Sequence, residues 1–148
     1  MKKIIVAVML FAGLFARATD APSAVNEKVL KAFKETFTAA QDVSWHEYDD
    51  YVQANFRQNE IQIRAIYNDE GQLVRTTRYY GEANLLPTVT ASLKKKYNGK
   101  EIFGVTEVSS SQEVTFVINL KDENNWYVVK SDVYGNLTQT DKFKRADK

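Results

Sequence analysis

The fold is decided by residues 51–67, which read YVQANFRQNEIQIRAIY. Apolar side chains alternate with polar ones on both sides of a polar turn at residues 57–60, at Val52, Ala54, Phe56, Ile61, Ile63 and Ala65. Such alternation is typical of half-buried strands joined in a hairpin. With Phe56 opposite Ile61, one side of the predicted hairpin faces a core and the other faces outward.

Amphipathic helices are predicted before this hairpin and after it. Over residues 24–37 apolar residues recur at spacings of three and four, which is the period of a helix with one buried side. A second helix is predicted from Pro87, a residue well suited to a first turn, to Tyr97, with Asn98-Gly99 as its end.

A second hairpin follows the second helix. Its apolar residues flank a polar turn at residues 121–124 and are Phe116, Ile118, Leu120, Tyr127 and Val129. Corresponding residues of the two parts lie 60 positions apart in the helices and 64 in the strands, so a longer connection is predicted at residues 99–112. We therefore predict an α+β, two-layer fold of tandem helix-plus-antiparallel-strand repeats. The repeats, about 24–80 and 85–143, would form one sheet of about six to eight strands with the helices on one face.

The first eighteen residues have the pattern of a signal peptide. Lys2 and Lys3 precede an apolar run too short to span a bilayer, and Ala16-Arg17-Ala18 fits a peptidase site. We expect residues 1–18 to be removed and residues 19–148 to form a single domain, periplasmic or secreted and not membrane-spanning after cleavage. Loss of three basic residues moves the formal charge from +1 to −2, so no basic excess remains for nucleic acid.

Composition excludes most catalytic and metal chemistry. The 148 residues include one His and no Cys, which leaves no thiolate nucleophile, disulfide or multi-His metal site. His46 lies near Asp49 and Asp50, but it belongs to a predicted strand and they to a turn. Oxygen-rich segments at 68–71 and 122–125 lack the ligand spacing of a calcium loop and are predicted to be turns. We expect no enzyme activity, no catalytic or metal-binding residue and no cofactor.

The outward side of the two hairpins is the candidate functional surface. In the second hairpin Val117 is predicted opposite Val128 and beside Trp126, an apolar patch with no helix to cover it. The candidate partner-binding residues combine this patch with outward residues of the first hairpin and are Trp126, Val128, Val117, Tyr51, Gln53 and Arg64.

Two alternatives to an open protein-binding face remain. The C-terminal segment, residues 79–80 or the 99–112 connection would cover the patch if one of them folded over it. A small apolar ligand or a peptide would bind between sheet and loops if Trp126 and the segment after Gly99 lined a pocket.

The motifs resemble those of exported PepSY-like proteins of Gram-negative bacteria, a family described as similar in fold to beta-lactamase-inhibitor proteins. The segments that carry the resemblance are Gln41-Asp42-Val43-Ser44-Trp45, Tyr51-Val52-Gln53-Ala54-Asn55-Phe56, Ile61 to Tyr67, Asn68-Asp69-Glu70-Gly71-Gln72-Leu73, and Leu86-Pro87 with Lys95-Lys96-Tyr97. The resemblance implies a periplasmic domain of tandem repeats that binds or inhibits another exported or cell-envelope protein. It also implies that the sheet face away from the helices is the binding surface.

Overall fold

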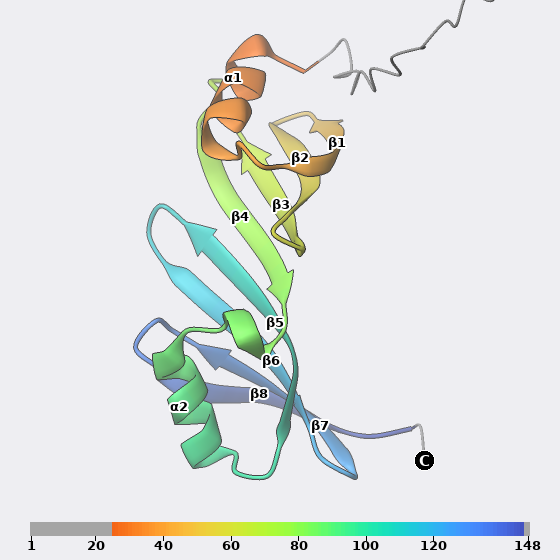
Figure 1. Cartoon of the computed structure of the whole chain (residues 1–148), viewed down its shortest axis with the longest axis vertical. Coiled ribbons are helices and arrows are strands. Elements are labelled where there is room, and N and C mark those ends of the chain that lie inside the picture. The colour runs from red at the N-terminus through yellow and green to blue at the C-terminus, as the bar shows by residue number, and fades with distance from the viewer. Residues whose placement is uncertain (1–24, 147–148) are drawn as a thin grey trace, which may run out of the picture.

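The structure, a computed structural model, describes residues 25–146 and contains one open antiparallel sheet with two helices (Figure 1). The predicted signal peptide lies outside the described residues. The helices are α1 (Glu27–Thr36) and α2 (Pro87–Lys96), and a single 3-10 turn, η1 (Glu82–Asn84), precedes α2. The strands are β1 (Gln41–Tyr48), β2 (Tyr51–Gln58), β3 (Ile61–Tyr67), β4 (Leu73–Tyr80), β5 (Glu101–Ser110), β6 (Val114–Lys121), β7 (Asn125–Ser131) and β8 (Leu137–Lys144). All eight follow one another in the sheet in chain order, each antiparallel to the next, so strands dominate the fold.

The first hairpin closes more tightly than the sequence predicts. Phe56 pairs with Ile63, so the predicted pairing of Phe56 with Ile61 is wrong by two residues. The turn contains only Asn59 and Glu60, whose φ angles are 51° and 64°. A two-residue turn with both φ angles positive matches the twist of the flanking strands. Because the shift is two residues, every side chain keeps its predicted face.

The second hairpin is displaced in the same sense. Val117 pairs with Lys130, and Val128 pairs with Asn119, so the predicted pairing of Val117 with Val128 is wrong. The connecting loop is closed by a hydrogen bond in which the Asp122 amide donates to the Asn125 carbonyl, one residue later than predicted. Val117, Val128 and Trp126 still share one side of the sheet.

Residues 99–112 do not form the predicted long connection. Residues 101–110 form β5, which pairs with β4 on one side and β6 on the other. This strand joins the two parts of the chain into one sheet. A bulge between Ile102 and Gly104 interrupts the pairing with β6 and changes the direction of the Phe103 side chain.

The core consists of two clusters under the two helices. Under α1, Val29 and Phe33 pack on strand residues of β2 and β3; under α2, Val89 and Leu93 pack on β5, β6 and β7. Tyr80 at the end of β4 packs against both clusters. The predicted amphipathic helices are therefore confirmed, with slightly shorter bounds.

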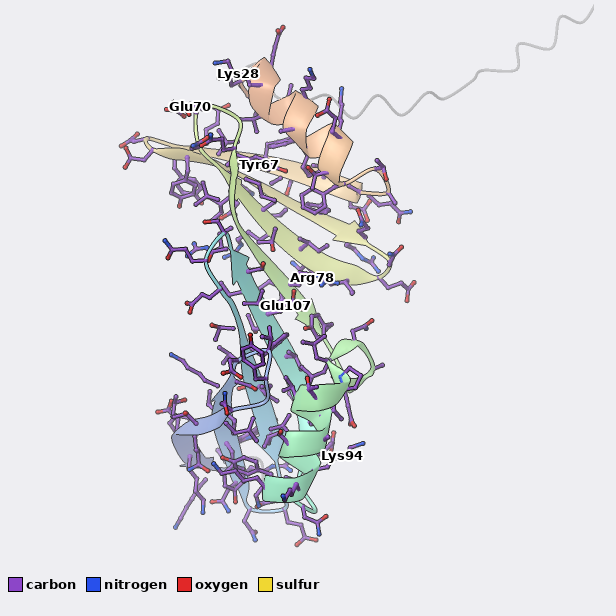
Figure 2. All side chains as sticks on the ribbon, turned by 90° about the vertical axis from the view of Figure 1, so that its left-hand side faces the viewer. Lys28, Tyr67, Glu70, Arg78, Lys94 and Glu107 are labelled. Atoms are coloured by element: carbon purple, nitrogen blue, oxygen red, sulfur yellow. The ribbon has the colours of Figure 1, made fainter. Side chains whose placement is uncertain are left out.

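Both helices lie on the same side of the sheet, as Figure 1 shows. The register requires this, because the buried residues Ile63 and Phe116 belong to one cross-strand row that continues through Arg78 and Glu107. In that row, between the two helices, Arg78 Nη1 lies 3.2 Å from Glu107 Oε1 (Figure 2). The Tyr80 hydroxyl donates to Glu107 Oε2 at 2.5 Å, and burial together with this bond raises the pKa of Tyr80.

Each helix rests on a glycine turn. Gly71, between β3 and β4, has φ of 80° and faces the backbone of Lys28 on α1, where a Cβ atom would lie 2.9 Å from the Lys28 carbonyl carbon and oxygen. Gly135, between β7 and β8, has φ of 81° and faces Ser92 on α2. Only glycine meets both the positive φ and the close approach without strain.

Candidate functional site

The outward face is the side of the sheet opposite both helices. It consists of the strand positions that alternate with the buried core residues, as the burial patterns of β2 and β3 show. Both described helices pack on the other side, so within residues 25–146 no helix lies over this face. The C-terminal segment forms edge strand β8, and residues 79–80 belong to β4. The segments considered as covers are thus part of the sheet.

The second half of the outward face carries an aromatic patch, formed by Phe103, Trp126 and Phe143. Phe103 and Trp126 meet edge to face with ring centroids 4.8 Å apart, and Phe143 pairs with Trp126 across β7 and β8. Phe103 is 58% exposed and Phe143 is 56% exposed. Lys121 Nζ lies 4.8 Å from the Phe103 ring, and the Arg145 guanidinium lies 5.8 Å from the Trp126 ring. Aromatic rings flanked by cations are typical of protein interfaces.

The first half of the outward face is polar and basic. Tyr51 stacks on Tyr48 with ring centroids 4.4 Å apart. Gln53 is almost fully buried and donates from Nε2 to Asn55 Oδ1 at 3.0 Å. Arg64, opposite Asn55, is exposed. This part of the face presents charge and hydrogen-bonding groups rather than a continuous apolar surface.

A shallow depression adjoins Tyr51 on this face. Its lining residues come from β2, β3, β4, the end of β5 and neighbouring turns and are Asp50, Tyr51, Ile66, Asn68, Val74, Arg75 and Ser110. Val74 is 48% exposed, so the depression offers apolar surface to solvent beside the Arg75 side chain.

All six predicted residues occupy the outward face, but they form two groups. Tyr51, Gln53 and Arg64 lie on β2 and β3, whereas Val117, Trp126 and Val128 lie on β6 and β7. Strands β4 and β5 separate the groups. A partner that contacted both would have to span the middle of the sheet.

Sequence reasoning missed Phe103 and Phe143. Simple alternation places Phe103 on the same side as the buried Val105, and only the bulge turns its ring outward to Trp126. A glycine at position 104 is the sequence signal for such a bulge. Phe143 was missed because no strand was predicted at the C-terminus; in β8 it lies opposite Trp126, on the same side as Asp141.

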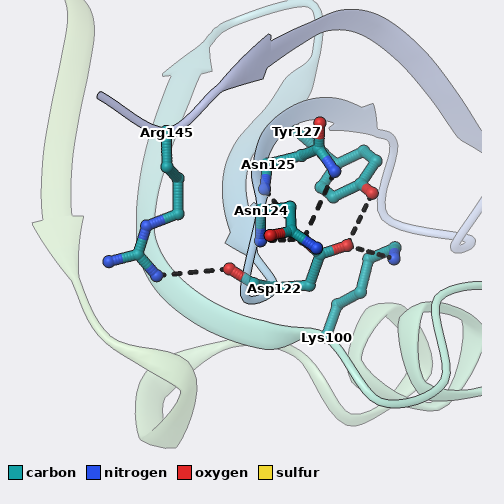
Figure 3. Close-up of polar contacts among 6 residues, drawn as sticks. All are labelled: Lys100, Asp122, Asn124, Asn125, Tyr127 and Arg145. Carbon is teal, nitrogen blue, oxygen red and sulfur yellow. Dashed lines mark hydrogen bonds and ion pairs between the residues drawn. The ribbon is translucent and has the colours of Figure 1, made fainter. Parts of the chain in front are cut away.

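The loop at residues 122–125 is a polar network on the helix side of the sheet, shown in Figure 3. Asp122 Oδ2 accepts from the Tyr127 hydroxyl at 2.6 Å and from Lys100 Nζ at 2.9 Å, while its Oδ1 accepts from the backbone amides of Asn124 and Asn125. Hydrogen bonds from Tyr127, Lys100 and the two amides hold the pKa of Asp122 well below its usual range. All these donors belong to the chain itself, so the hydrogen bonds of Asp122 fix the conformation of the loop.

The oxygen-rich turn at residues 68–71 is also held by internal hydrogen bonds. Asn68 Oδ1 accepts from the amides of Glu70 and Gln72 at 3.1 and 2.9 Å, which confirms the predicted turn chemistry. Among residues 25–146 no three His, Cys, Asp or Glu side chains are grouped so that they could hold a metal ion.

Neither His46 nor the hollow next to Gly99 belongs to the candidate binding surface. His46 is exposed on β1 opposite Gln53, in the strand predicted for it. The hollow next to Gly99 is lined on the helix side by Tyr97 and Ile102 among others, and it does not include Trp126.

None of the described helices is long and apolar enough to cross a membrane.

These features define a class of fold: an open antiparallel meander with both helices on one face and an exposed opposite face. No protein-family model matches the chain, and no curated protein matches its sequence. Solved structures with this fold do match. A DUF2874 family protein from Bacteroides ovatus is 25% identical, with a TM-score of 0.62 over 86% of this chain and 91% of that one.

Two further structures share the fold at lower identity. A BLIP-like protein from Bacteroides fragilis is 15% identical, with a TM-score of 0.63 over 82% of this chain and 89% of that one. A candidate periplasmic protein from Bacteroides eggerthii is 14% identical, with a TM-score of 0.61 over 80% and 88%. The resemblance to beta-lactamase-inhibitor-like proteins is thereby confirmed: the chain has the fold of the BLIP-like and DUF2874 proteins.

Proposed function

We propose that this chain is a non-enzymatic exported binding module that holds a protein partner on its outward sheet face. The observation that carries the proposal is the aromatic patch, with two phenylalanine rings more than half exposed around Trp126 and cations beside them. Exposed apolar surface costs free energy in water, and patches of this kind commonly mark interaction sites. The partner would be another exported or cell-envelope protein.

Export is part of the proposal. It is supported by the signal-peptide pattern of residues 1–18 and by the candidate periplasmic protein among the structures with this fold. A module without cysteine needs no oxidising folding machinery and would depend on its packed core for stability.

We also propose that the two halves are tandem copies of one unit. Each consists of a helix followed by four strands, in the order α1, β1–β4 and α2, β5–β8. The glycine turns under the helices occupy matching places, since Gly71 and Gly135 are 64 residues apart and both have φ near 80°. Copies that keep the core and vary the outward residues would provide two different surfaces on one sheet.

The second candidate is a carrier of a peptide or small ligand. The depression beside Tyr51 and Arg75 favours it, because it combines exposed apolar atoms with a guanidinium. A protein partner remains the first choice because the rings of the aromatic patch are exposed rather than enclosed, with Phe103 and Phe143 more than half accessible.

Affinity capture from a native envelope extract tests the proposal. The wild-type chain is compared with Phe103→Ser and Trp126→Ser, which remove the aromatic patch. Tyr134→Ser is the matched control, because Tyr134 is 82% exposed but lies in the turn after β7. A protein retained by wild type and Tyr134→Ser, and lost by folded Phe103→Ser, is expected. Recovery of a lipid or metabolite and no protein would contradict the proposal in favour of the carrier.

A further inference from the structure

Three arginines form a diagonal across the first half of the outward face. Arg57 on β2 pairs with Gln62, and Arg64 lies two residues beyond Gln62 on β3. Arg64 pairs with Thr77, and Arg75 lies two residues before Thr77 on β4. Diagonal neighbours on adjacent strands lie about 7–8 Å apart, within reach of long side chains. All three arginines are exposed, and we call Arg57, Arg64 and Arg75 the arginine diagonal.

The arginine diagonal is not neutralised by ion pairs within the described residues. Within residues 25–146 none of the three makes an ion pair, whereas Arg78 on the helix side of β4 is paired with Glu107. The outward positions of β2, β3 and β4 contain no Asp or Glu. Asp42, in the β1 bulge next to the Gln41–Arg57 pair, and Asp50, which lines the depression with Arg75, lie near the two ends of the diagonal, and neither forms an ion pair with it. Like charges on neighbouring strands repel, so this arrangement lowers stability until an anion neutralises it.

Apolar surface adjoins the arginine diagonal at one end. Arg75 lines the depression that also contains Ile66 and Val74. A guanidinium is a planar fork that matches a carboxylate in two parallel hydrogen bonds. The combination suits an acidic side chain followed closely by an apolar or aromatic one.

We propose that the arginine diagonal binds an acidic segment of a protein partner, with carboxylates on the guanidiniums and an apolar side chain in the depression. This inference rests on the proposed function and names the chemistry of the partner. The attraction is local, because the chain expected after signal cleavage carries a formal charge of −2. A bare polyphosphate or lipid headgroup layer would leave the apolar depression without a matching group.

A copolymer of glutamate and tyrosine is the probe. Its binding to the purified protein is followed by fluorescence anisotropy at increasing NaCl. We expect saturable binding that weakens by about tenfold between about 50 and about 300 mM salt, because exposed charges are screened over that range. The combined change Arg57→Gln, Arg64→Gln and Arg75→Gln should weaken binding by about tenfold or more.

The matched control is a triple variant that removes the same charge from the helices: Lys31→Gln, Lys34→Gln and Lys95→Gln, all exposed. It should bind within about twofold of wild type, and both triple variants should melt as single folded proteins. The arginine variant should melt no lower than wild type, because it relieves repulsion. Equal losses in the two variants, or no saturable binding, would overturn the inference.

Two competitors decide between classes of partner. Polyphosphate and phosphatidylglycerol vesicles should compete less well than the unlabelled copolymer. Tighter binding of either through the same arginines would overturn the assignment to a protein. If a captured envelope protein is lost by Phe103→Ser but kept by the arginine variant, the inference fails while the proposed function stands. If the copolymer binds through the arginines but capture yields no protein dependent on the outward face, the proposed function fails instead.

Discussion

The two halves of the chain have matching cores, but the large central side chain comes from the helix in the first half and from the strands in the second. At the centre of the first sheet half, Ala54 pairs with Ala65, and the helix above supplies Phe33. At the matching places of the second half, Ile118 pairs with Val129 and the helix supplies Leu93. The first half thus combines small strand residues with a large helix residue. The second half combines larger strand residues with a smaller helix residue. Close packing fixes the total side-chain volume between helix and sheet, but either layer can contribute that volume.

The hairpins and outward faces differ more than the cores. The first hairpin closes with the two-residue turn Asn59-Glu60, while the second uses the Asp122 network. Outside, the first half is basic and the second aromatic. Conserved packing beneath divergent surfaces is expected if the fold is a scaffold and the outward face does the binding.

The largest effect should come from emptying either core. Phe56→Ala and Phe116→Ala remove rings that are 2% and 1% exposed, and each should cost about 3–5 kcal/mol of unfolding free energy. Because Tyr80 packs against both clusters and β4 pairs with β5, both variants should shift one common transition in urea, followed by tryptophan fluorescence and circular dichroism. Two separate transitions, each moved by one variant, would show that the halves fold independently.

The glycine turns should differ in cost although their φ angles agree. In Gly71→Ala the new Cβ meets the Lys28 backbone, which cannot move without shifting α1, so we expect a loss of about 2–4 kcal/mol. In Gly135→Ala the nearest atom is Ser92 Oγ, which can rotate away, and the closest backbone atom, the Thr88 carbonyl oxygen, is 3.1 Å away, so we expect about 1–2 kcal/mol. Urea denaturation measures both. Adding Ser92→Ala should lower the cost at Gly135 further, and equal costs for the two glycines would contradict this difference.

The core of the first half can be given the residue sizes found in the second half, which tests the comparison of the two cores. Ala54→Ile inserts three carbons under Phe33 and should cost about 1–3 kcal/mol through overpacking. Phe33→Leu alone leaves a cavity. The double variant copies the arrangement of the second half and should be more stable than the sum of the single changes predicts, as a double-mutant cycle measures. Strict additivity would mean that these two side chains do not share one volume.

The Asp122 network should make the second hairpin sensitive to acid. The pKa of Asp122 in the folded chain lies below its ordinary value near 3.8, so its ionised form stabilises the fold above that pH. This stabilisation is lost as the pH falls toward the folded pKa. Asp122→Asn should lower stability at pH 7 and flatten its fall between about pH 5 and pH 2, measured by urea denaturation.

The control for this prediction is Glu60→Gln in the turn of the first hairpin, where an exposed carboxylate also lies between paired strands. It should change the unfolding free energy by less than about 0.5 kcal/mol at pH 7. An Asp122→Asn variant as stable as Glu60→Gln at pH 7 would mean that the network contributes nothing to the fold.

Periodicity in the sequence was sufficient for much of the fold. Alternation at Val52, Ala54 and Phe56 gave the correct face, and the helical spacing of Phe33 and Val29 gave the correct contact. Turn lengths were not accessible in this way, since a shift of two residues leaves alternation unchanged. Strand β5 was missed because its polar residues and glycine resemble a loop until β4 and β6 supply their hydrogen bonds.

The candidate site was predicted only where alternation is regular. Trp126 and Arg64 were placed on the outward face from their neighbours in sequence. Phe103 was not, because a bulge reverses its direction. The arginine diagonal also depends on register across three strands, a relation between distant residues that local patterns do not contain.

The most direct test of the binding face is photo-crosslinking in intact cells. A photoreactive phenylalanine analogue is placed at Val128 on the outward face, and at Ala91, an exposed residue of α2, on the helix side. We predict a crosslinked envelope protein from position 128 that is absent from position 91. A protein captured from position 91 and none from position 128 would contradict the account, because the partner would then bind the helices.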